Sequence, residues 1–330
     1  MTDYTAFPPL PSPGACALPH LGVIRAVGPD AASFLHNQLT QDFLLIQPGQ
    51  ARLAAFCNAK GRMQASMVGF KTGQEEVLLV MRQDLLPQTL KRLSMFVLRA
   101  KVKLGDASAD WPVWGVLQAD GGAPWSCQPW HPAAANTEAP SAWQLSLYPA
   151  VGVFRSLVVG PMSADLPLLN LADWQLGEVL SGIADVQAAT FEAFVPQMLN
   201  YESVDGVNFK KGCYPGQEVV ARSQFRGTLK RRTYLVSSDK ALLVGQEVFT
   251  GSVAAGSDQS QTSAEPVGIV AHTASHPAHG DWALVCLQNS ALEAALATPT
   301  GSTSGAVTLQ TSTGATLTLH PLPYVLRDDI

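Results

Sequence analysis

Cysteine is scarce in this sequence, and its few cysteines lie too far apart to form a cluster motif. The chain of 330 residues has 5 cysteines, at positions 16, 57, 127, 213 and 286. Their odd number and wide spacing argue against a disulfide framework. No C-x-x-C pair or ferredoxin-like run of cysteines occurs, so the chain does not encode a metal-cluster site of its own. We therefore expect a protein of the reducing cytoplasm.

Several other signals are absent from the sequence. No apolar run approaches the roughly 18 residues that a membrane span needs. The N-terminal residues lack the basic and apolar regions of a secretory signal. The nucleotide-binding patterns G-x-G-x-x-G and G-x-x-x-x-G-K-[ST] and the hydrolase pattern G-x-S-x-G are also missing. These absences argue against a membrane protein, a nucleotide-binding enzyme and a serine hydrolase.

Charged residues make up only 14% of the chain, and the net charge is −5. This acidic balance argues against strong nucleic-acid binding. Seven of the 21 basic residues nevertheless fall between Lys210 and Arg232, where Glu218 is the only acid. Such a run is either a solvated face or a surface that binds an anion, and the sequence leaves both open.

Three histidines lie close together at His272, His276 and His279. Three imidazoles could hold a zinc ion. However, Pro277 breaks any helix that would align them, and no carboxylate or thiol lies between them. We favour a polar turn here and assign no metal site.

The composition predicts a globular protein, because 47% of its residues are hydrophobic. Its length predicts two or three domains. Strand patterns alternate with two helices, which are expected to begin at Asp30 and Asp84. This alternation predicts a ferredoxin-like α+β domain over residues 1–110.

The rest of the chain divides into two further regions. Strand patterns and a helix capped by Asp173 predict a second α+β domain over residues 111–232. Within it, residues 119–142 form a long loop rich in Gly, Pro, Ala and Ser, to which we assign no function. After that domain the pattern is all-β, which predicts a C-terminal β-barrel over residues 233–330.

One turn carries the most distinctive chemistry of the chain. Apolar residues alternate over residues 207–209, which predicts a short strand, and two lysines follow. Gly212 and Gly216 then bracket a turn that contains Cys213. Nearby cations favour the nucleophilic thiolate over the thiol. The turn is therefore either a reactive thiol site or a surface turn around an inert, packed cysteine.

Residues 211–218 have the pattern Lys-Gly-Cys-Tyr-x-Gly-Gln-Glu, which resembles the signature of the YgfZ folate-binding family. That family is related to the glycine-cleavage T-protein. Four further stretches extend the resemblance, at residues 58–61, 194–197, 225–227 and 321–324. Together these stretches span nearly the whole chain.

The resemblance implies an α+β architecture of three T-protein-like domains in a ring. Two interleaved ferredoxin-like domains would precede the barrel, and tetrahydrofolate or a derivative would bind in the central hole. The implied function is a folate-binding accessory protein that assists assembly or repair of iron–sulfur clusters in client enzymes, such as radical-SAM tRNA-modifying enzymes. Its implied partners are folate and iron–sulfur client or assembly proteins. Two alternatives remain, a folate-dependent aminomethyltransferase and a regulatory folate-binding module.

The resemblance also assigns roles to single residues. Cys213 would be the working thiol, and Lys211 would be its cationic neighbour. Trp174 and Leu21 stand at the two positions where the family places a tryptophan at the folate site. The residues expected to hold the turn are Gly212, Tyr214, Gly216, Gln217, Glu218, Arg222 and Arg226.

The chain departs from the T-protein pattern at several of these positions. Ala65 and Ser66 replace the acidic pair of the aminomethyltransferases, and neither can act as a carboxylate acid or base. The glutamate that hydrogen-bonds the pterin would fall at Leu180, which has no acceptor. Leu21 stands where a second tryptophan is expected. These departures argue against aminomethyl transfer and remove two expected folate contacts.

Overall fold

The computed structural model describes residues 6–130, 142–162, 166–225, 229–253, 260–262, 265–297 and 307–327. The first of its sheets has five antiparallel strands in the order β3-β4-β5-β2-β6. Its strands are β2 (Leu21–Val27), β3 (Ala51–Cys57), β4 (Met63–Gly73), β5 (Glu76–Arg82) and β6 (Lys103–Asp106), and its helices are α1 (Ala31–His36) and α2 (Leu86–Ser94). The central strands are rich in Val, Ile, Leu and Met and are mostly buried. The arrangement is ferredoxin-like, with β3 added at one edge.

The second sheet also has five strands, in the order β1-β7-β10-β9-β8. They are β1 (Gly14–Ala17), β7 (Val113–Gln118), β8 (Cys127–Trp130), β9 (Ala142–Ser146) and β10 (Phe154–Val159). The helices that follow are α3 (Leu171–Leu180), the short 3₁₀ helices η1 (Ala188–Thr190) and η2 (Pro196–Leu199), and α4 (Gln217–Phe225). Because β1 precedes the first sheet in sequence but pairs with β7, the chain crosses from the second sheet to the first and back.

The C-terminal region is a β-barrel. Its strands are β11 (Arg231–Ser238), β12 (Glu247–Val253), β13 (Ser260–Thr262), β14 (Gly268–His276), β15 (Gly280–Gln288), β16 (Val307–Thr311) and β17 (Thr316–His320). The sheet closes because β12 pairs with both β14 and β16, while β13 extends beyond the ring. The α+β class and the C-terminal barrel predicted from the sequence are thus confirmed.

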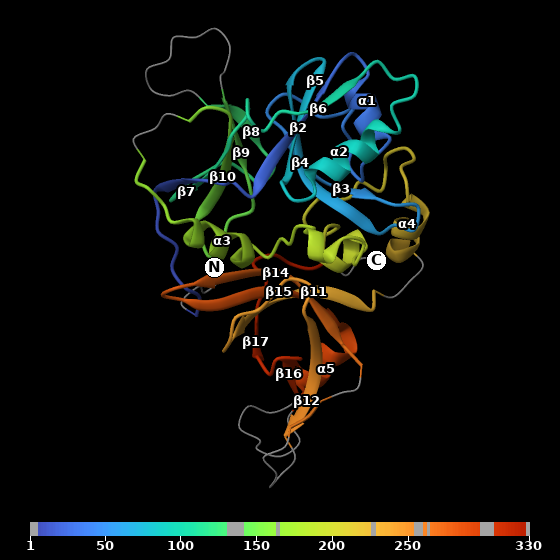
Figure 1. Ribbon diagram of the computed structural model, residues 1–330. Coiled ribbons are helices and arrows are strands. Elements are labelled where there is room, and N and C mark those ends of the chain that lie inside the picture. The colour runs from blue at the N-terminus through green and yellow to red at the C-terminus, as the bar shows by residue number, and fades with distance from the viewer. Residues whose placement is uncertain are drawn as a thin grey trace.

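The two sheets lie side by side, and the barrel lies beneath them with α3 and strands β14 and β15 at the junction (Figure 1). One hydrophobic core joins all three parts, from Val23 of the first sheet and Leu117 of the second to Leu284 of the barrel. Among the described residues, no helix is long and apolar enough to cross a membrane. This packing leaves a central space between the three sheets.

The structure corrects both of the helix caps expected in the first domain. Helix α1 does follow Asp30, but the Asp30 carboxylate accepts a hydrogen bond from the Lys101 backbone N–H and does not cap the helix. Helix α2 begins at Leu86, and the Asp84 carboxylate accepts a hydrogen bond from the backbone N–H of Ala188. Both acids therefore tie distant segments together, which a local capping rule does not anticipate.

Four other expectations about secondary structure were wrong. Within the loop expected over residues 119–142, residues 127–130 form strand β8. Residues 207–209 form no strand. Helix α3 begins at Leu171, two residues before the expected cap Asp173. The C-terminal region is not all-β, because helix α5 (Asn289–Leu296) follows β15 and packs on β15 and β16.

Candidate functional site

A cavity lies where the three sheets meet. Its volume is about 110 Å³. Most of its wall is apolar or aromatic, with a few convergent polar groups. It is lined by Leu21, Leu53, Ser66, Met67, Val68, Val80, Met81, Arg82, Trp125, Leu147, Tyr148, Arg155, Leu157, Glu178, Ser181, Ile183, Ala184, Asp185, Tyr201 and His272.

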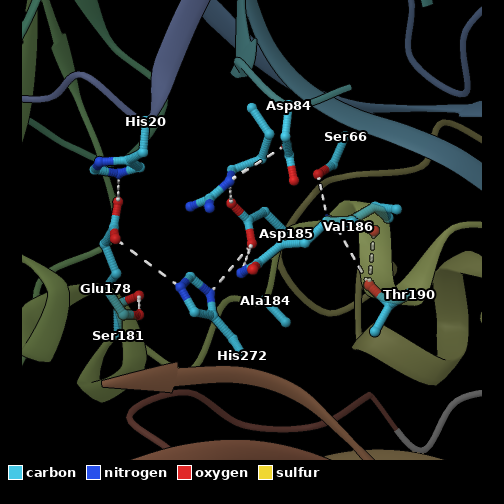
Figure 2. Close-up of polar contacts among 12 residues, drawn as sticks. His20, Ser66, Asp84, Glu178, Ser181, Ala184, Asp185, Val186, Thr190 and His272 are labelled. Atoms are coloured by element: carbon cyan, nitrogen blue, oxygen red, sulfur yellow. Dashed lines mark hydrogen bonds and ion pairs between the residues drawn. The ribbon is translucent and has the colours of Figure 1, made fainter. Parts of the chain in front are cut away.

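Glu178 of α3 is the central polar group of this cavity (Figure 2). Its Oε1 atom lies 3.2 Å from His20 Nε2 and accepts a hydrogen bond of 2.9 Å from the indole N–H of Trp174, one helical turn earlier. Its Oε2 atom is buried, has no hydrogen-bond partner among the described residues, and lies 3.9 Å from His272 Nε2. The carboxylate is thus fixed through one oxygen and leaves the other free for a ligand.

The surroundings keep Glu178 ionised. Burial raises the pKa of its carboxyl group, but a hydrogen bond from His20 and the positive charges of His20, His272 and Arg155 together lower that pKa to about 2. The Arg155 guanidinium is itself buried and lies 4.7 Å from the centre of the Trp174 ring. Burial lowers the Arg155 pKa to about 10, so this side chain remains a cation near neutral pH.

A chain of ion pairs continues from Glu178 across the cavity wall (Figure 2). His272 of β14 lies 3.3 Å from the Asp185 carboxylate, and Asp185 lies 3.6 Å from the Arg82 guanidinium of β5. Arg82 in turn lies 3.9 Å from Asp84. The network joins the barrel to the first sheet through the segment that follows α3.

His272 was expected to lie in a polar turn with His276 and His279, and that expectation was wrong. His272 and His276 belong to strand β14, where His272 is buried and lines the cavity. His276 lies 3.0 Å from the carboxylate of Asp173 and stacks on His279 with ring centres 4.6 Å apart. No group of histidines, cysteines and acids within the described ranges is arranged to hold a metal ion.

Of the two residues expected at the folate site, one lines the cavity and the other does not. Leu21 lines the cavity. Trp174 does not: it is fully buried behind the wall, where its ring packs against Gly115 of β7. Leu180, where the resemblance places a glutamate, does not line the cavity, whereas Glu178, two residues earlier, does. The pairing of an indole and a carboxylate four residues apart on α3 was the sequence signal for Glu178.

The positions of the missing acidic pair are also defined. Ala65 is buried in β4, and Ser66 lines the cavity with its hydroxyl oxygen accepting a hydrogen bond of 2.9 Å from the Val186 backbone N–H. Neither residue supplies a carboxylate, and the serine is already engaged in holding the segment after α3. The nearest sequence neighbour with a polar side chain, Gln64, donates a hydrogen bond to Glu192.

Loss of one hydrogen bond should reveal how strongly Glu178 is held. Trp174→Phe keeps an aromatic ring in the core but removes the N–H that Glu178 accepts, and a hydrogen bond to a charged group contributes about 1.5–3 kcal/mol. We expect the free energy of unfolding in urea at pH 7 to fall by that amount. Trp282→Phe is the matched control, because the Trp282 indole donates to an uncharged carbonyl of His279 and should cost only about 0.5–1.5 kcal/mol. Equal losses of unfolding free energy in the two variants would contradict a charged Glu178 as the acceptor.

The turn that carries Cys213 is anchored first to the segment after α1. Thr40 donates its hydroxyl hydrogen to the carbonyl oxygen of Gly206, and the Asn208 backbone N–H donates to the carbonyl oxygen of Thr40. Gln41 donates its side-chain amide to the Asp205 carbonyl oxygen at 2.7 Å. The expected strand at residues 207–209 is replaced by these irregular contacts, which satisfy the backbone equally well.

The other end of the turn is anchored to residues 58–61. Gly216 has φ +81°, and a Cβ atom there would lie 2.4 Å from the Asn58 carbonyl oxygen. Gly61 has φ +70°, and a Cβ atom there would lie 3.0 Å from the Val219 side chain of α4. Gln197 of η2 also donates a hydrogen bond of 2.7 Å to the Val220 carbonyl oxygen. Three of the stretches that carry the family resemblance therefore converge around α4.

Cys213 differs from the other cysteines in its exposure. All 5 cysteines lie within the described ranges, and Cys213 is exposed while the other four are buried. Burial raises the pKa of each of those four thiols to about 12, so they remain protonated at neutral pH. The turn thus presents a single accessible thiol.

Lys211 points inward from the turn. Its ammonium group donates hydrogen bonds to the carbonyl oxygens of Leu39 at 3.1 Å and Gly212 at 3.3 Å, and it lies 4.5 Å from the centre of the Tyr214 ring. Burial lowers the Lys211 pKa to about 8, although Asp42 and Cys213 act in the opposite direction. Lys211 and the buried Tyr214 therefore hold the turn on its buried side.

The remaining motif residues lie farther from the thiol. Gln217 begins α4, and Glu218 accepts a hydrogen bond of 2.8 Å from Arg222 at the helix surface. Arg226 lies outside the described residues. The basic run does not form one anion-binding face, because Lys211 is buried and Arg232 is buried in an ion pair with Glu202.

The structure belongs to the T-protein-like fold class, with a central cavity and a separate thiol turn. The structure is similar to glycine cleavage system aminomethyltransferase T from Bartonella henselae, with a TM-score of 0.61 and 14% sequence identity over 94% of this chain and 86% of that chain. At this identity the similarity shows the fold alone.

Sequence relatives identify the family within that class. No model of a known protein family matches the sequence. The chain is 30% identical over 237 residues to the tRNA-modifying protein YgfZ of Vibrio vulnificus strain YJ016, covering 69% of this chain and 71% of the relative. It is also 30% identical over 255 residues to the protein of that name from Photobacterium profundum, covering 73% and 74%. The chain belongs to the YgfZ family.

Proposed function

We propose that this protein is a folate-binding accessory factor that assists assembly or repair of iron–sulfur clusters in client enzymes. The observation that carries this proposal is the single exposed thiol of Cys213 on a turn anchored at both ends. An iron–sulfur cluster normally takes four protein ligands. One accessible thiolate suits transient capture of iron, sulfur or a cluster edge, with the other ligands supplied by the client.

The ligand proposed for the cavity is tetrahydrofolate or a derivative. A pterin presents adjacent N–H donors on one edge and flat apolar faces. Glu178 Oε2 is a buried acceptor without a hydrogen-bond partner among the described residues, and Trp125, Tyr148 and Tyr201 add aromatic surface to a mostly apolar wall. Glu178 would bind the N–H edge, while the burial of the site excludes water. Folate in this position would supply a one-carbon carrier or a bound ligand that stabilises the three-sheet junction.

The clients proposed are enzymes that modify tRNA. Curated relatives carry the name tRNA-modifying protein, and the family resemblance implies radical-SAM enzymes of this kind. Aminomethyl transfer is not favoured, because Ser66 supplies no carboxylate at the cavity and its hydroxyl oxygen is engaged with the Val186 N–H.

Cys213→Ser should abolish client support without affecting folding. Serine is similar in size to cysteine but does not ionise near neutral pH, and the exposed side chain contributes little to the core. We expect the variant to unfold at the same urea concentration as the parent. In a strain lacking its own copy of the gene, it should fail to restore thiolation of tRNA, measured by mass spectrometry of nucleosides.

Cys127→Ser is the matched control for this experiment. Its thiol is buried, so serine should cost stability but leave client support in place at permissive temperature. If Cys213→Ser restores thiolation as well as the parent does, Cys213 is not the working thiol and the proposed function fails.

A further inference from the structure

His36 is buried directly beside the thiol turn. It is the last residue of α1, and only 8% of its surface is exposed. Its Nδ1 atom lies 3.1 Å from the Asp42 carboxylate. The ring's other nitrogen, Nε2, faces Gly212, because a Cβ atom built on Gly212 would lie 3.5 Å from it. Cys213 is the next residue along the chain.

Asp42 fixes which ring nitrogen of His36 is a base. Burial raises the Asp42 pKa, but hydrogen bonds from the Leu45 backbone N–H and from His36 hold it below its usual value. An ionised carboxylate only accepts hydrogen bonds, so Nδ1 of His36 carries the hydrogen. In the neutral ring the lone pair is then on Nε2, the atom that faces the turn.

We propose that His36 is the proton acceptor for the Cys213 thiol and that Asp42 positions its ring. On rotation of the cysteine side chain, the proton leaves Sγ for Nε2 and yields a thiolate beside an imidazolium, while Asp42 keeps its negative charge. No electrons are transferred. The thiolate is the form that binds soft metal ions such as Fe²⁺ and attacks sulfur or carbon electrophiles. The inference deepens the proposed function, on which the role of Cys213 rests.

Lys211 is less suited to this task, although its pKa is low for a lysine. Its ammonium group is held by two backbone carbonyls and the Tyr214 ring, so it must lose a proton and leave those contacts before it can act as a base. The charged groups around His36 are Asp42 on its own segment and Lys211 on the turn, with Arg52 and Lys71 acting on Asp42. Asp42 is the one in direct contact with His36.

The rate at which iodoacetamide alkylates Cys213 tests the inference. A thiol without a base is only a few per cent ionised at pH 7, so we expect His36→Gln to lower the rate there by about 10- to 30-fold. In the parent the rate should stay high below pH 8, and His36→Gln should remove that reactivity while leaving the rate at pH 9.5 unchanged. Alkylation is measured on the full-length folded protein by mass spectrometry of the Cys213 peptide.

Two further variants complete the experiment. His279→Gln, on the barrel hairpin, is the matched control and should keep the parent profile. Asp42→Asn retains the shape of the side chain but not its charge, so it should lower the rate below pH 8 and decides the question if His36→Gln does not fold. Unchanged profiles in folded His36→Gln and Asp42→Asn would overturn the inference. Client support is scored separately, so a failure of the proposed function does not alter the alkylation result.

Discussion

Replacing Glu178 with glutamine is expected to weaken tetrahydrofolate binding by about 10- to 150-fold, because a hydrogen bond to a charged group contributes about 1.5–3 kcal/mol. The amide has the shape of the carboxylate, so the cavity keeps its volume. It presents N–H donors, however, where the pterin edge also presents donors. The Oε2 atom that this edge would use has no hydrogen-bond partner among the described residues. Affinity is measured by anaerobic calorimetric titration at pH 7.

Glu293→Gln makes the same chemical change on the exposed face of α5 and should leave affinity unchanged. Equal affinities for Glu178→Gln and the parent would exclude Glu178 from the binding site. A cavity that binds no folate in the parent would refute the folate part of the proposed function and leave the thiol turn untouched.

Glu178→Gln should also differ from the parent in its stability at acid pH. The hydrogen bond from His20 and the positive charges around Glu178 outweigh its burial and lower its pKa to about 2. A carboxyl group whose pKa is lower in the folded state stabilises the protein above its unfolded pKa of about 4.3. That stabilisation is lost as the pH falls from about 4.3 toward 2. The free energy of unfolding should therefore fall more steeply across this window in the parent than in Glu178→Gln.

The thiol turn could be found from the sequence because its determinants are local. Two glycines, a proline and a cysteine within six residues describe a tight turn whatever the rest of the chain does. The exposure of Cys213 and the need for glycine at position 216 agree with that interpretation. His36 escaped notice because it lies about 180 residues earlier, and only the packing of α1 against the turn brings it near.

The cavity could not be found in the same way, because its polar residues come from distant segments. His20, Glu178 and His272 belong to three different parts of the chain and meet only when the barrel packs on α3. Without that contact, only its spacing from Trp174 distinguishes Glu178 from a surface acid, and His272 resembles a turn histidine. The same reasoning explains the error at residues 207–209, where the Asn208 backbone N–H donates to the Thr40 carbonyl oxygen without forming a strand.

Gly216→Ala is expected to destabilise the protein and misplace the thiol turn. A residue with a Cβ atom at φ +81° costs about 1–2 kcal/mol. The new methyl group would also lie 2.4 Å from the Asn58 carbonyl oxygen and 2.7 Å from the Gly61 backbone. Overpacking of this kind costs a further ~1–3 kcal/mol of unfolding free energy. Because both opposing groups are backbone atoms, relief requires the turn itself to move. Urea unfolding measures the stability, and the alkylation rate of Cys213 reports the position of the thiol.

Gly280→Ala separates the cost of the positive φ angle from the cost of the close contact with residues 58–61. Gly280 has φ +73°, close to that of Gly216, but a Cβ atom there would meet nothing within 4 Å. Both substitutions also restrict the unfolded chain to the same extent, so that effect cancels in the comparison. Gly280→Ala should therefore lose only the backbone contribution and leave Cys213 alkylation and client support intact. If Gly216→Ala is no less stable than Gly280→Ala, the turn does not depend on close contact with residues 58–61. The convergence of the family's motifs around α4 would then have no role in holding the thiol.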